Sequence, residues 1–314
     1  MARSKIQLRH LLYFVKIVEA GSFSRAANRI HVAQPALSQQ MAELENSLGV
    51  SLLYRSARGV LPTAAGKLLH AEAEAIIHRI EHLPDLVRSC GEDVKGVVRV
   101  GMSTVLAWFM ANAITGACKA ALPNVTLHFV TATSEQLTSR IREHSLDIAV
   151  IFDGTFAQGV ASHSLFKQKL FLISHATTLV GEDHVAWDRL RNMALILPAH
   201  SHEIISRTIL ASLFKEGSLV PRIIEENDVF ATLSAVQAGL GSALMAIGDL
   251  SHAKGGSEVK AVPLEPPIYM PVSQITSAEQ PLVPAAEAVS QVVRNLIARY
   301  MDEHKIAGAV PVYP

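Results

Sequence analysis

The spacing of apolar residues changes once along this chain of 314 residues, near residue 96. Before that point apolar side chains recur at helical intervals, as in the stretch from Leu8 to Val18. After it, short apolar strands alternate with helices, which is typical of doubly wound α/β units with mostly parallel sheets. A chain of this length exceeds one core. We therefore expect a small helical head (residues 1–66) and a larger α/β domain.

Three helices are predicted in the head. The first ends near residue 20, the second covers residues 23–30 after Ser22 as its cap, and the third opens at Gln34-Pro35, where the missing N–H of proline costs nothing. Two short helices separated by about three residues form a helix-turn-helix, whose second helix enters the major groove of DNA. Glutamine and serine on the exposed face of that helix suit contacts to bases and phosphates.

Residues 52–63 are predicted to form a small hairpin, or wing, with Gly59 at the bend. Arg55 and Arg58 on it would contact backbone phosphates or a neighbouring minor groove. The head has eight Lys and Arg and three Glu, so 8 − 3 = +5, and the rest of this formally neutral chain carries −5. A basic head on an acidic body suits DNA binding, whereas a helical subdomain with a solvated polar face is the alternative.

The head resembles that of LysR-type transcriptional regulators. The resemblance rests on motifs that occur in order: residues 8–15, 21–27, 33–40, 44–45, 54–60 and 62–66. The sequence of residues 33–40 is most similar to that of the nitrogen assimilation control branch of the family. The resemblance implies a winged helix-turn-helix that reads promoter DNA. The residues expected to contact DNA are Ser24, Arg25, Gln34, Pro35, Ser38, Gln39, Arg55, Arg58 and Thr63.

Two positions depart from the pattern of that family. Ala33 stands where many members have serine, so the third helix lacks a side-chain cap. Gln39 stands where many members have arginine, which should shift base preference from guanine towards adenine.

A long linker helix is predicted from residue 63 to about residue 87. Apolar residues follow an a/d spacing over roughly three heptads, namely Leu69, Ala73, Ile76, Ile80, Leu83 and Val87. This pattern favours pairing of two copies, and a helix lying on its own domain is the alternative. Pro84 predicts a bend or an end near residues 80–84. Residues 67–94 are therefore assigned to the linker helix and a hinge.

Beyond residue 95, eight strands and five helices are predicted. The strands are 97–101, 125–131, 146–152, 166–174, 194–197, 219–225, 242–246 and 268–275, and the helices are 106–121, 134–143, 203–216, 229–238 and 281–304. Ligands bind beyond the carboxyl ends of such strands, often at helix N-termini. Ser103-Thr104 and Thr133-Ser134 stand at such places and suit an anionic small molecule, with plain helix caps as the alternative.

Residues 146–150 and 237–244 resemble the effector domain of the LysR family, which is similar to a two-lobed periplasmic solute-binding protein. The resemblance implies a first lobe of residues 95–165 and 269–304, a second lobe of 166–268, and a tail of 305–314. It also implies a cleft lined by Ser103, Thr104, Phe152, His202 and Phe230. His200 and His202 could instead ligate a metal, but spacing indicates no third ligand. No metal or cofactor is expected.

The function expected from these features is a cytoplasmic DNA-binding regulator that responds to a small effector. Its partners would be promoter DNA, the effector, RNA polymerase and further copies of itself, from dimer to tetramer, without a membrane. Rival classes are a solute-binding protein, an enzyme and an architectural DNA-binding protein. The chain contains no common catalytic motif such as Gly-x-Ser-x-Gly. Its two cysteines, Cys90 and Cys118, are read as ordinary thiols, with a redox pair as the alternative.

Overall fold

The computed structural model describes residues 6–56, 59–88, 94–152, 159–197, 222–225, 229–250 and 258–312. Its contacts divide the chain into two units. The N-terminal unit comprises Met1–Glu92 with Glu143–Ser145, and the C-terminal unit comprises Asp93–Arg142 with Leu146–Pro314. No helix in the described ranges is long and apolar enough to cross a membrane.

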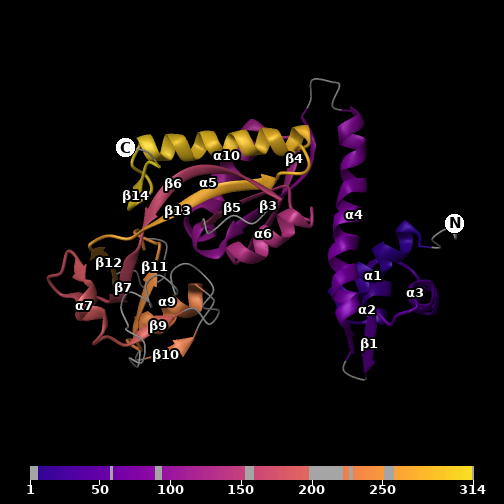
Figure 1. Cartoon of the computed structure of the whole chain (residues 1–314), viewed down its shortest axis with the longest axis horizontal. Coiled ribbons are helices and arrows are strands. Elements are labelled where there is room, and N and C mark those ends of the chain that lie inside the picture. The colour runs from indigo at the N-terminus through magenta and orange to yellow at the C-terminus, as the bar shows by residue number, and fades with distance from the viewer. Residues whose placement is uncertain are drawn as a thin grey trace. The chain divides into compact units, whose positions relative to one another are not determined.

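The N-terminal unit is a winged helix-turn-helix followed by a long helix (Figure 1). Its elements are α1 (Leu8–Ala20), α2 (Phe23–Arg29), α3 (Gln34–Leu48), β1 (Leu53–Ser56), β2 (Gly59–Pro62) and α4 (Ala64–Arg88). Ser22 caps α2 by accepting a hydrogen bond from the Arg25 N–H. Ala33 gives α3 no side-chain cap, as predicted, and Pro35 lies in its first turn. The apolar sides of α1 and α3 meet in one core, which includes Phe14, Leu37, Met41, Leu44 and Leu52.

The predicted wing is the antiparallel hairpin of β1 and β2. Leu53 pairs with Pro62, and Arg55 pairs with Val60. Gly59 has φ +128°, a conformation that L side chains rarely adopt. The next residue, Val60, donates its N–H to the Gly21 carbonyl at 3.0 Å, which fixes the wing against the turn between α1 and α2.

Helix α4 continues past Pro84 to Arg88, so it does not end near residues 80–84, and the other predicted outcome, a bend there, stays a prediction. A proline inside a helix removes one backbone hydrogen bond. The neighbours of Pro84 in the sequence include Glu81, Leu83 and Leu86, which are residue types that favour helix. This preference is consistent with α4 continuing past Pro84.

The heptad spacing predicted for α4 divides into two parts with different roles. Ala73 is fully buried against Leu11 and Val15 of α1, and Leu69 packs on the same cluster. Further along, three apolar side chains are exposed, namely Ile76 (41%), Ile80 (39%) and Leu83 (52%). We call these three residues the exposed stripe. The first part of the heptad series therefore packs on the chain's own head, and among its described side chains the exposed stripe is left for a partner.

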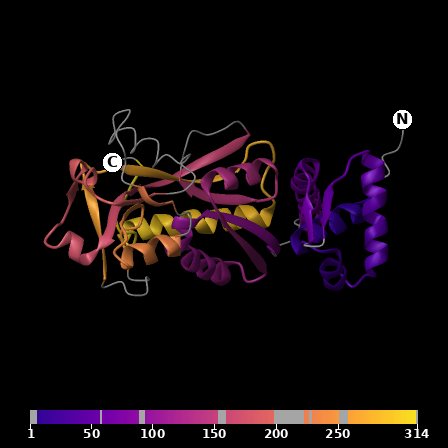
Figure 2. The same ribbon diagram turned by 90° about the horizontal axis from the view of Figure 1, so that it is seen from below.

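The first lobe of the C-terminal unit is a six-stranded sheet in the order β14-β6-β13-β5-β3-β4. Its strands are β3 (Gly96–Ser103), β4 (Val125–Ala132), β5 (Ile148–Phe152), β6 (Val160–Lys169), β13 (Tyr269–Ser277) and β14 (Ala309–Val310). Helices α5 (Thr104–Ala121) and α10 (Pro284–Asp302) pack on one face, and α6 (Ser134–Arg142) packs on the other (Figures 1 and 2). Val98, Val100 and Met102 face the first pair, whereas Ala149 and Ile151 face α6.

The second lobe is a six-stranded sheet in the order β10-β9-β11-β7-β12-β8. Its elements are β7 (Phe171–His175), a 3-10 turn η1 (Ala176–Leu179), β8 (Val185–Ala186), α7 (Trp187–Leu190), β9 (Leu195–Leu197), β10 (Arg222–Glu225), α9 (Val229–Gln237), β11 (Ser242–Met245) and β12 (Val259–Glu265). Two crossovers join the lobes, one from β6 to β7 and one from β12 to β13. The expected two-lobed α/β architecture is therefore confirmed.

Several details of the predicted strands differ. The strand predicted at residues 166–174 is two strands, β6 and β7, which belong to different sheets and meet at Leu170. Both sheets are mixed, because β13 runs antiparallel to β5 and β6, and β7 runs antiparallel to β11 and β12. Strand β14 lies in the predicted tail and joins the edge of the first sheet. The helix predicted at residues 203–216 lies outside the described residues.

Candidate operator-contacting face and effector site

The outer face of α3 carries the side chains that were predicted to read DNA. Gln34, Pro35 and Gln39 are exposed, and Ser38 is half-buried. The opposite face of the helix is fully buried through Leu37, Met41 and Leu44. Burial of this apolar stripe fixes which side of the helix faces outward. Ser24 and Arg25 are exposed in the first turn of α2.

The Gln39 amide is engaged within its own helix. Its Nε2 donates to Glu43 Oε1 at 3.1 Å, and Gln40 Nε2 donates to Glu43 Oε2 at 3.0 Å. Pairs at this spacing on an exposed helix surface contribute only a few tenths of a kcal/mol (about 0.2–0.5). The amide of Gln39 can therefore leave Glu43 and present both its donor and its acceptor to adenine.

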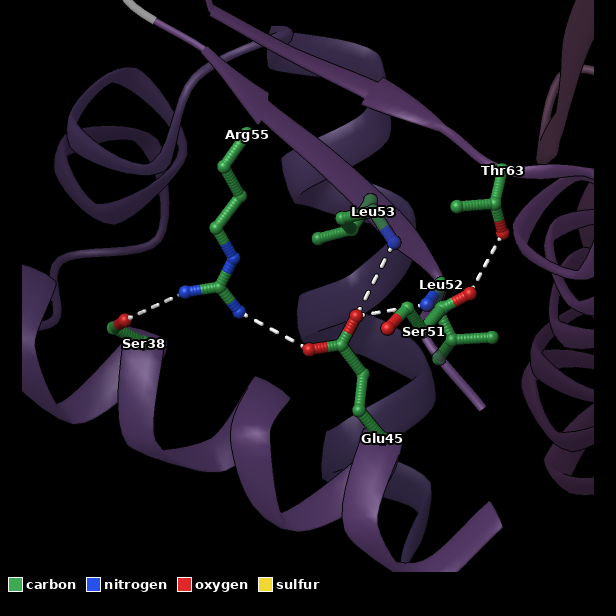
Figure 3. Close-up of polar contacts among 7 residues, drawn as sticks. All are labelled: Ser38, Glu45, Ser51, Leu52, Leu53, Arg55 and Thr63. Carbon is green, nitrogen blue, oxygen red and sulfur yellow. Dashed lines mark hydrogen bonds and ion pairs between the residues drawn. The ribbon is translucent and has the colours of Figure 1, made fainter. Parts of the chain in front are cut away.

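Arg55 on the wing is bonded to α3 (Figure 3). Its Nη1 donates to Ser38 Oγ at 3.4 Å, and its Nη2 donates to Glu45 Oε2 at 3.2 Å. The other oxygen of Glu45 accepts the N–H groups of Leu52 at 2.8 Å and Leu53 at 3.2 Å. The Arg55 guanidinium also lies 4.7 Å from the centroid of the ring of Phe23. Arg55, predicted as a phosphate contact, thus has partners on two helices of the head.

Thr63, also predicted as a backbone contact, is a buried cap residue with 8% exposure. Its hydroxyl donates to the Ser51 carbonyl at 2.8 Å and accepts the Gly66 N–H at 3.0 Å. The single hydroxyl proton is therefore already used inside the protein. The side chain joins the segment just before β1 to the start of α4 and offers no exposed group to a phosphate. Arg58 lies outside the described residues.

The predicted effector residues of the first lobe gather at one edge of its sheet. Strand β3 runs parallel to both β4 and β5, so the carboxyl ends of these strands lie together, and Ser103 pairs with Ala132. Ser103 and Thr104 follow one strand, Thr133 and Ser134 follow the next, and Phe152 ends the third.

The two hydroxyl sites at this edge differ in how they are bonded. Thr133 accepts the Gln136 N–H at 3.3 Å, and the Gln136 side chain accepts the Thr133 N–H at 3.2 Å, so Thr133 is a plain helix cap. Ser103 stands before α5 but makes no such bond. Its side chain is 4% exposed, and its Oγ has no hydrogen-bond partner among the described residues. Of the two hydroxyls, that of Ser103 makes no hydrogen bond to a described residue, whereas that of Thr133 already accepts one and keeps its proton.

An aromatic pair joins α5 to the second lobe. The Trp108 ring lies 4.8 Å from that of Phe230 on α9, at an angle of 64°. Trp108 Nε1 is buried and, within the described ranges, has no acceptor, while Phe230 is 65% exposed. Phe230 was predicted from the sequence and Trp108 was not, although Trp108 stands four residues after Thr104 and thus on the same side of the helix. His200 and His202 lie outside the described residues.

Comparisons with known proteins agree with this architecture. Residues 8–67 match the family described as bacterial regulatory helix-turn-helix protein, lysR family, and residues 91–298 match the LysR substrate binding domain. The chain is 33% identical over 308 residues to the nitrogen assimilation regulatory protein nac of Escherichia coli, covering 96% of this chain and 98% of that protein. It is 32% identical over the same length to nac of Klebsiella aerogenes, covering 96% and 98% of the two chains.

Solved structures share the fold at lower identity. The crystal structure of CbnR, a LysR family transcriptional regulator, has a TM-score of 0.69 at 22% identity, covering 93% of this chain and 99% of CbnR. A full-length OxyR variant from Pseudomonas aeruginosa has a TM-score of 0.65 at 22% identity, covering 92% and 97%. The head, the two-lobed C-terminal unit and matches along nearly the whole sequence lead to one conclusion: this chain belongs to the LysR family of transcription regulators.

Proposed function

We propose that this chain binds promoter DNA as a homo-oligomer in the cytoplasm, and that a small anionic effector bound in its C-terminal unit changes how it binds. The exposed face of α3 supports the first half of the proposal, because its polar side chains are held outward by a buried apolar stripe. The residues proposed to touch the operator are Ser24, Arg25, Gln34, Pro35, Ser38, Gln39 and Arg58.

The buried, unbonded hydroxyl of Ser103 carries the effector half of the proposal. It precedes α5, and the first N–H groups of a helix attract anions through their free donors and the helix dipole. Trp108 Nε1, within α5, is a second buried donor. A buried donor without an acceptor costs about 1–3 kcal/mol, which a carboxylate ligand would recover. Thr104, Phe152, Phe230 and His202 are proposed to complete the site, with Thr133 and Ser134 beside it.

The exposed stripe on α4 supports pairing of two copies. Ile76, Ile80 and Leu83 recur at helical spacing on one side of α4 and are each at least 39% exposed. A second copy of the same helix would bury these side chains. The pair would place two α3 helices on one operator, about one helical turn apart or a multiple of it. Further pairing through the C-terminal units would give tetramers, and a changed operator geometry would recruit or hinder RNA polymerase.

Sedimentation at micromolar concentration tests the pairing. We expect Ile80→Glu to shift the protein towards monomer, because a charge on the stripe cannot be buried without a partner. Lys67→Glu is the matched control, since Lys67 is exposed on the opposite side of α4. Equal behaviour of the two variants would contradict pairing through the stripe.

A thermal-shift experiment tests the effector half. Both tryptophans, Trp108 and Trp187, lie in the C-terminal unit, so their fluorescence reports its unfolding. We expect a small carboxylate from a panel of mono- and dicarboxylates to raise the midpoint of the wild-type protein and to change its footprint on DNA. Ser103→Ala should lose both responses while keeping its DNA affinity. Equal protection of both proteins, or protection by sulfate alone, would contradict the proposed site.

A further inference from the structure

We propose that Arg55 is a positioning residue for sequence readout: it holds Ser38 so that the serine hydroxyl donates a hydrogen bond to an acceptor on the edge of an operator base. The proposal rests on the proposed role of α3 in reading DNA. It replaces the phosphate contact that the sequence predicted for Arg55.

The pleat of the wing directs Arg55 inward. Cross-strand partners share a face, and Arg55 pairs with Val60, which is 8% exposed. The neighbouring pair, Tyr54 and Leu61, occupies the other face, where the two side chains are 65% and 69% exposed. Because side chains alternate along a strand, Arg55 begins on the side of the wing that faces the helices of the head.

The guanidinium group is then fixed by partners of different kinds. Glu45 accepts one arm of the fork, Ser38 accepts another, and the Phe23 ring lies beside the group at 4.7 Å. Glu45 cannot easily move away, because its second oxygen accepts two backbone N–H groups at the start of β1. The planar fork of arginine makes both bonds at once, and lysine has no such geometry. The negative charge of Glu45 also offsets the positive charge of Arg55, which weakens Arg55 as a phosphate ligand.

These bonds define the role of the Ser38 hydroxyl. A serine hydroxyl has one proton and two lone pairs, and within a helix it commonly donates to the carbonyl four residues earlier. In this structure the Ser38 oxygen accepts from Arg55, so a lone pair is occupied and the proton remains for an outside acceptor. Purine N7, guanine O6 and thymine O4 are the acceptors exposed in the major groove.

The test starts with the full-length wild-type protein and a random pool of DNA duplexes, from which the preferred site is selected. Affinities for every single-base-pair variant of that site are then measured at fixed salt for wild type, Ser38→Ala, Arg55→Lys and the double variant. We expect Ser38→Ala and Arg55→Lys to lower discrimination at the same base pair by roughly tenfold, with little further loss in the double variant. Arg55→Lys retains the charge, so its salt dependence should match that of wild type.

Two further variants distinguish loss of the Arg55 interactions from misfolding of the head. Glu45→Gln retains an oxygen for the Leu52 N–H but loses the ion pair, and we expect it to lower discrimination at the same base pair. Arg29→Lys is the matched control, because Arg29 is exposed at the end of α2 and its side chain has no hydrogen bond or ion pair with any described residue. It should discriminate as wild type does. Circular dichroism would verify that each variant is folded.

The opposite pattern would overturn the proposal. If Arg55→Lys or Glu45→Gln discriminates as wild type does, while Arg55→Gln lowers the slope of log affinity against log salt by about one, Arg55 is a phosphate contact. Unchanged discrimination by Ser38→Ala would also overturn it. A wild-type protein that selects no preferred sequence would contradict the proposed operator readout itself, which separates that failure from failure of the Arg55 role.

Discussion

The Ser103 and Thr133 hydroxyls stand at the ends of neighbouring parallel strands, and each precedes a helix. Thr133 exchanges hydrogen bonds with Gln136, whereas Ser103 has no partner among the described residues. At the residue scale this difference separates a hydroxyl that caps a helix from one that makes no hydrogen bond to the described residues.

Removing each hydroxyl should therefore have unequal effects on stability. We expect Thr133→Ala to destabilise the C-terminal unit by about 1 kcal/mol, the usual effect of losing a cap. Ser103→Ala should be neutral or slightly stabilising, because it removes a buried polar group that lacks a partner. Tryptophan fluorescence during urea unfolding measures both. An equal loss in Ser103→Ala would indicate that Ser103 has a structural partner.

The distinction was readable in part from the sequence. Thr133-Ser-Glu-Gln136 is a capping box, in which the glutamine three residues later completes the bond pair. Ser103 is followed at that spacing by Leu106, which cannot do so. The burial of Ser103, by contrast, depends on the packing of α5 against the sheet, and no local pattern predicts it. The contact between Trp108 and Phe230 joins positions over a hundred residues apart, so no local pattern predicts it either.

Cys118 should be chemically inert in the folded protein. Burial raises the pKa of its thiol, and the thiolate is the reactive form. We expect iodoacetamide to label the Cys90→Ser variant at pH 7.5 roughly tenfold or more slowly when native than in guanidinium. The raised pKa also means that this thiol's contribution to stability is complete below about pH 8.5, the ordinary value, and is lost as pH rises above it. Rapid native labelling would support the redox alternative.

At the scale of elements, the wing depends on one glycine. A Cβ on Gly59 would lie 2.7 Å from the Gly21 carbonyl oxygen, and its φ of +128° is strained for other residues. Gly49, which ends α3, also has positive φ, but a Cβ there meets nothing within 4 Å. The sequence predicted a hairpin with Gly59 at its bend, and in the structure Gly59 begins β2 and pairs with Ser56. Its close approach to the turn after α1 was not predicted.

Substituting the two glycines should separate strain from steric conflict. Gly49→Ala should cost about 1–2 kcal/mol for its left-handed backbone. Gly59→Ala should cost several kcal/mol, because the backbone strain is joined by a clash with a carbonyl that accepts the Val60 N–H. Circular dichroism should show an earlier unfolding transition while tryptophan fluorescence is unchanged. Equal losses in both variants would mean that the turn moves aside freely.

At the scale of the whole molecule, the alternation of strands and helices predicted doubly wound α/β units, and the family resemblance implied two lobes. Two of the errors lie in the strands on either side of the crossovers. Residues 165–173 form an apolar-rich run without glycine or proline, so nothing marks Leu170 as the point where the chain changes sheets. Strand β12 was not predicted, because Lys260 and Pro263 interrupt its apolar alternation. Which strands pair across these crossovers is decided by contacts between distant residues.

The C-terminal segment makes another such long-range contact, and truncation tests its contribution to the stability of the C-terminal unit. Gln168 Nε2 donates to the Ala307 carbonyl at 2.9 Å, Lys169 donates its N–H to Gly308, and Ile306 is 8% exposed. Ending the chain at Asp302 should destabilise the C-terminal unit by about 3 kcal/mol, from two hydrogen bonds of about 1 kcal/mol and the burial of Ile306. Ending it at Val310 keeps β14 and should change little. Equal midpoints by tryptophan fluorescence would contradict this role.

Helix α4 packs on its own head through Ala73 and exposes its stripe from Ile76 onward. The number of residues between these two positions therefore fixes the angle about the helix axis between the surface that packs on the head and the exposed stripe. Each residue added between them would rotate the exposed stripe by about 100° and move it about 1.5 Å away from the head. A single-residue insertion would therefore turn the two heads of a pair away from their common operator, whereas a seven-residue insertion would nearly restore their facing at a wider separation. Natural variation in the length of this stretch would then change the spacing of the DNA half-sites that such a regulator can occupy.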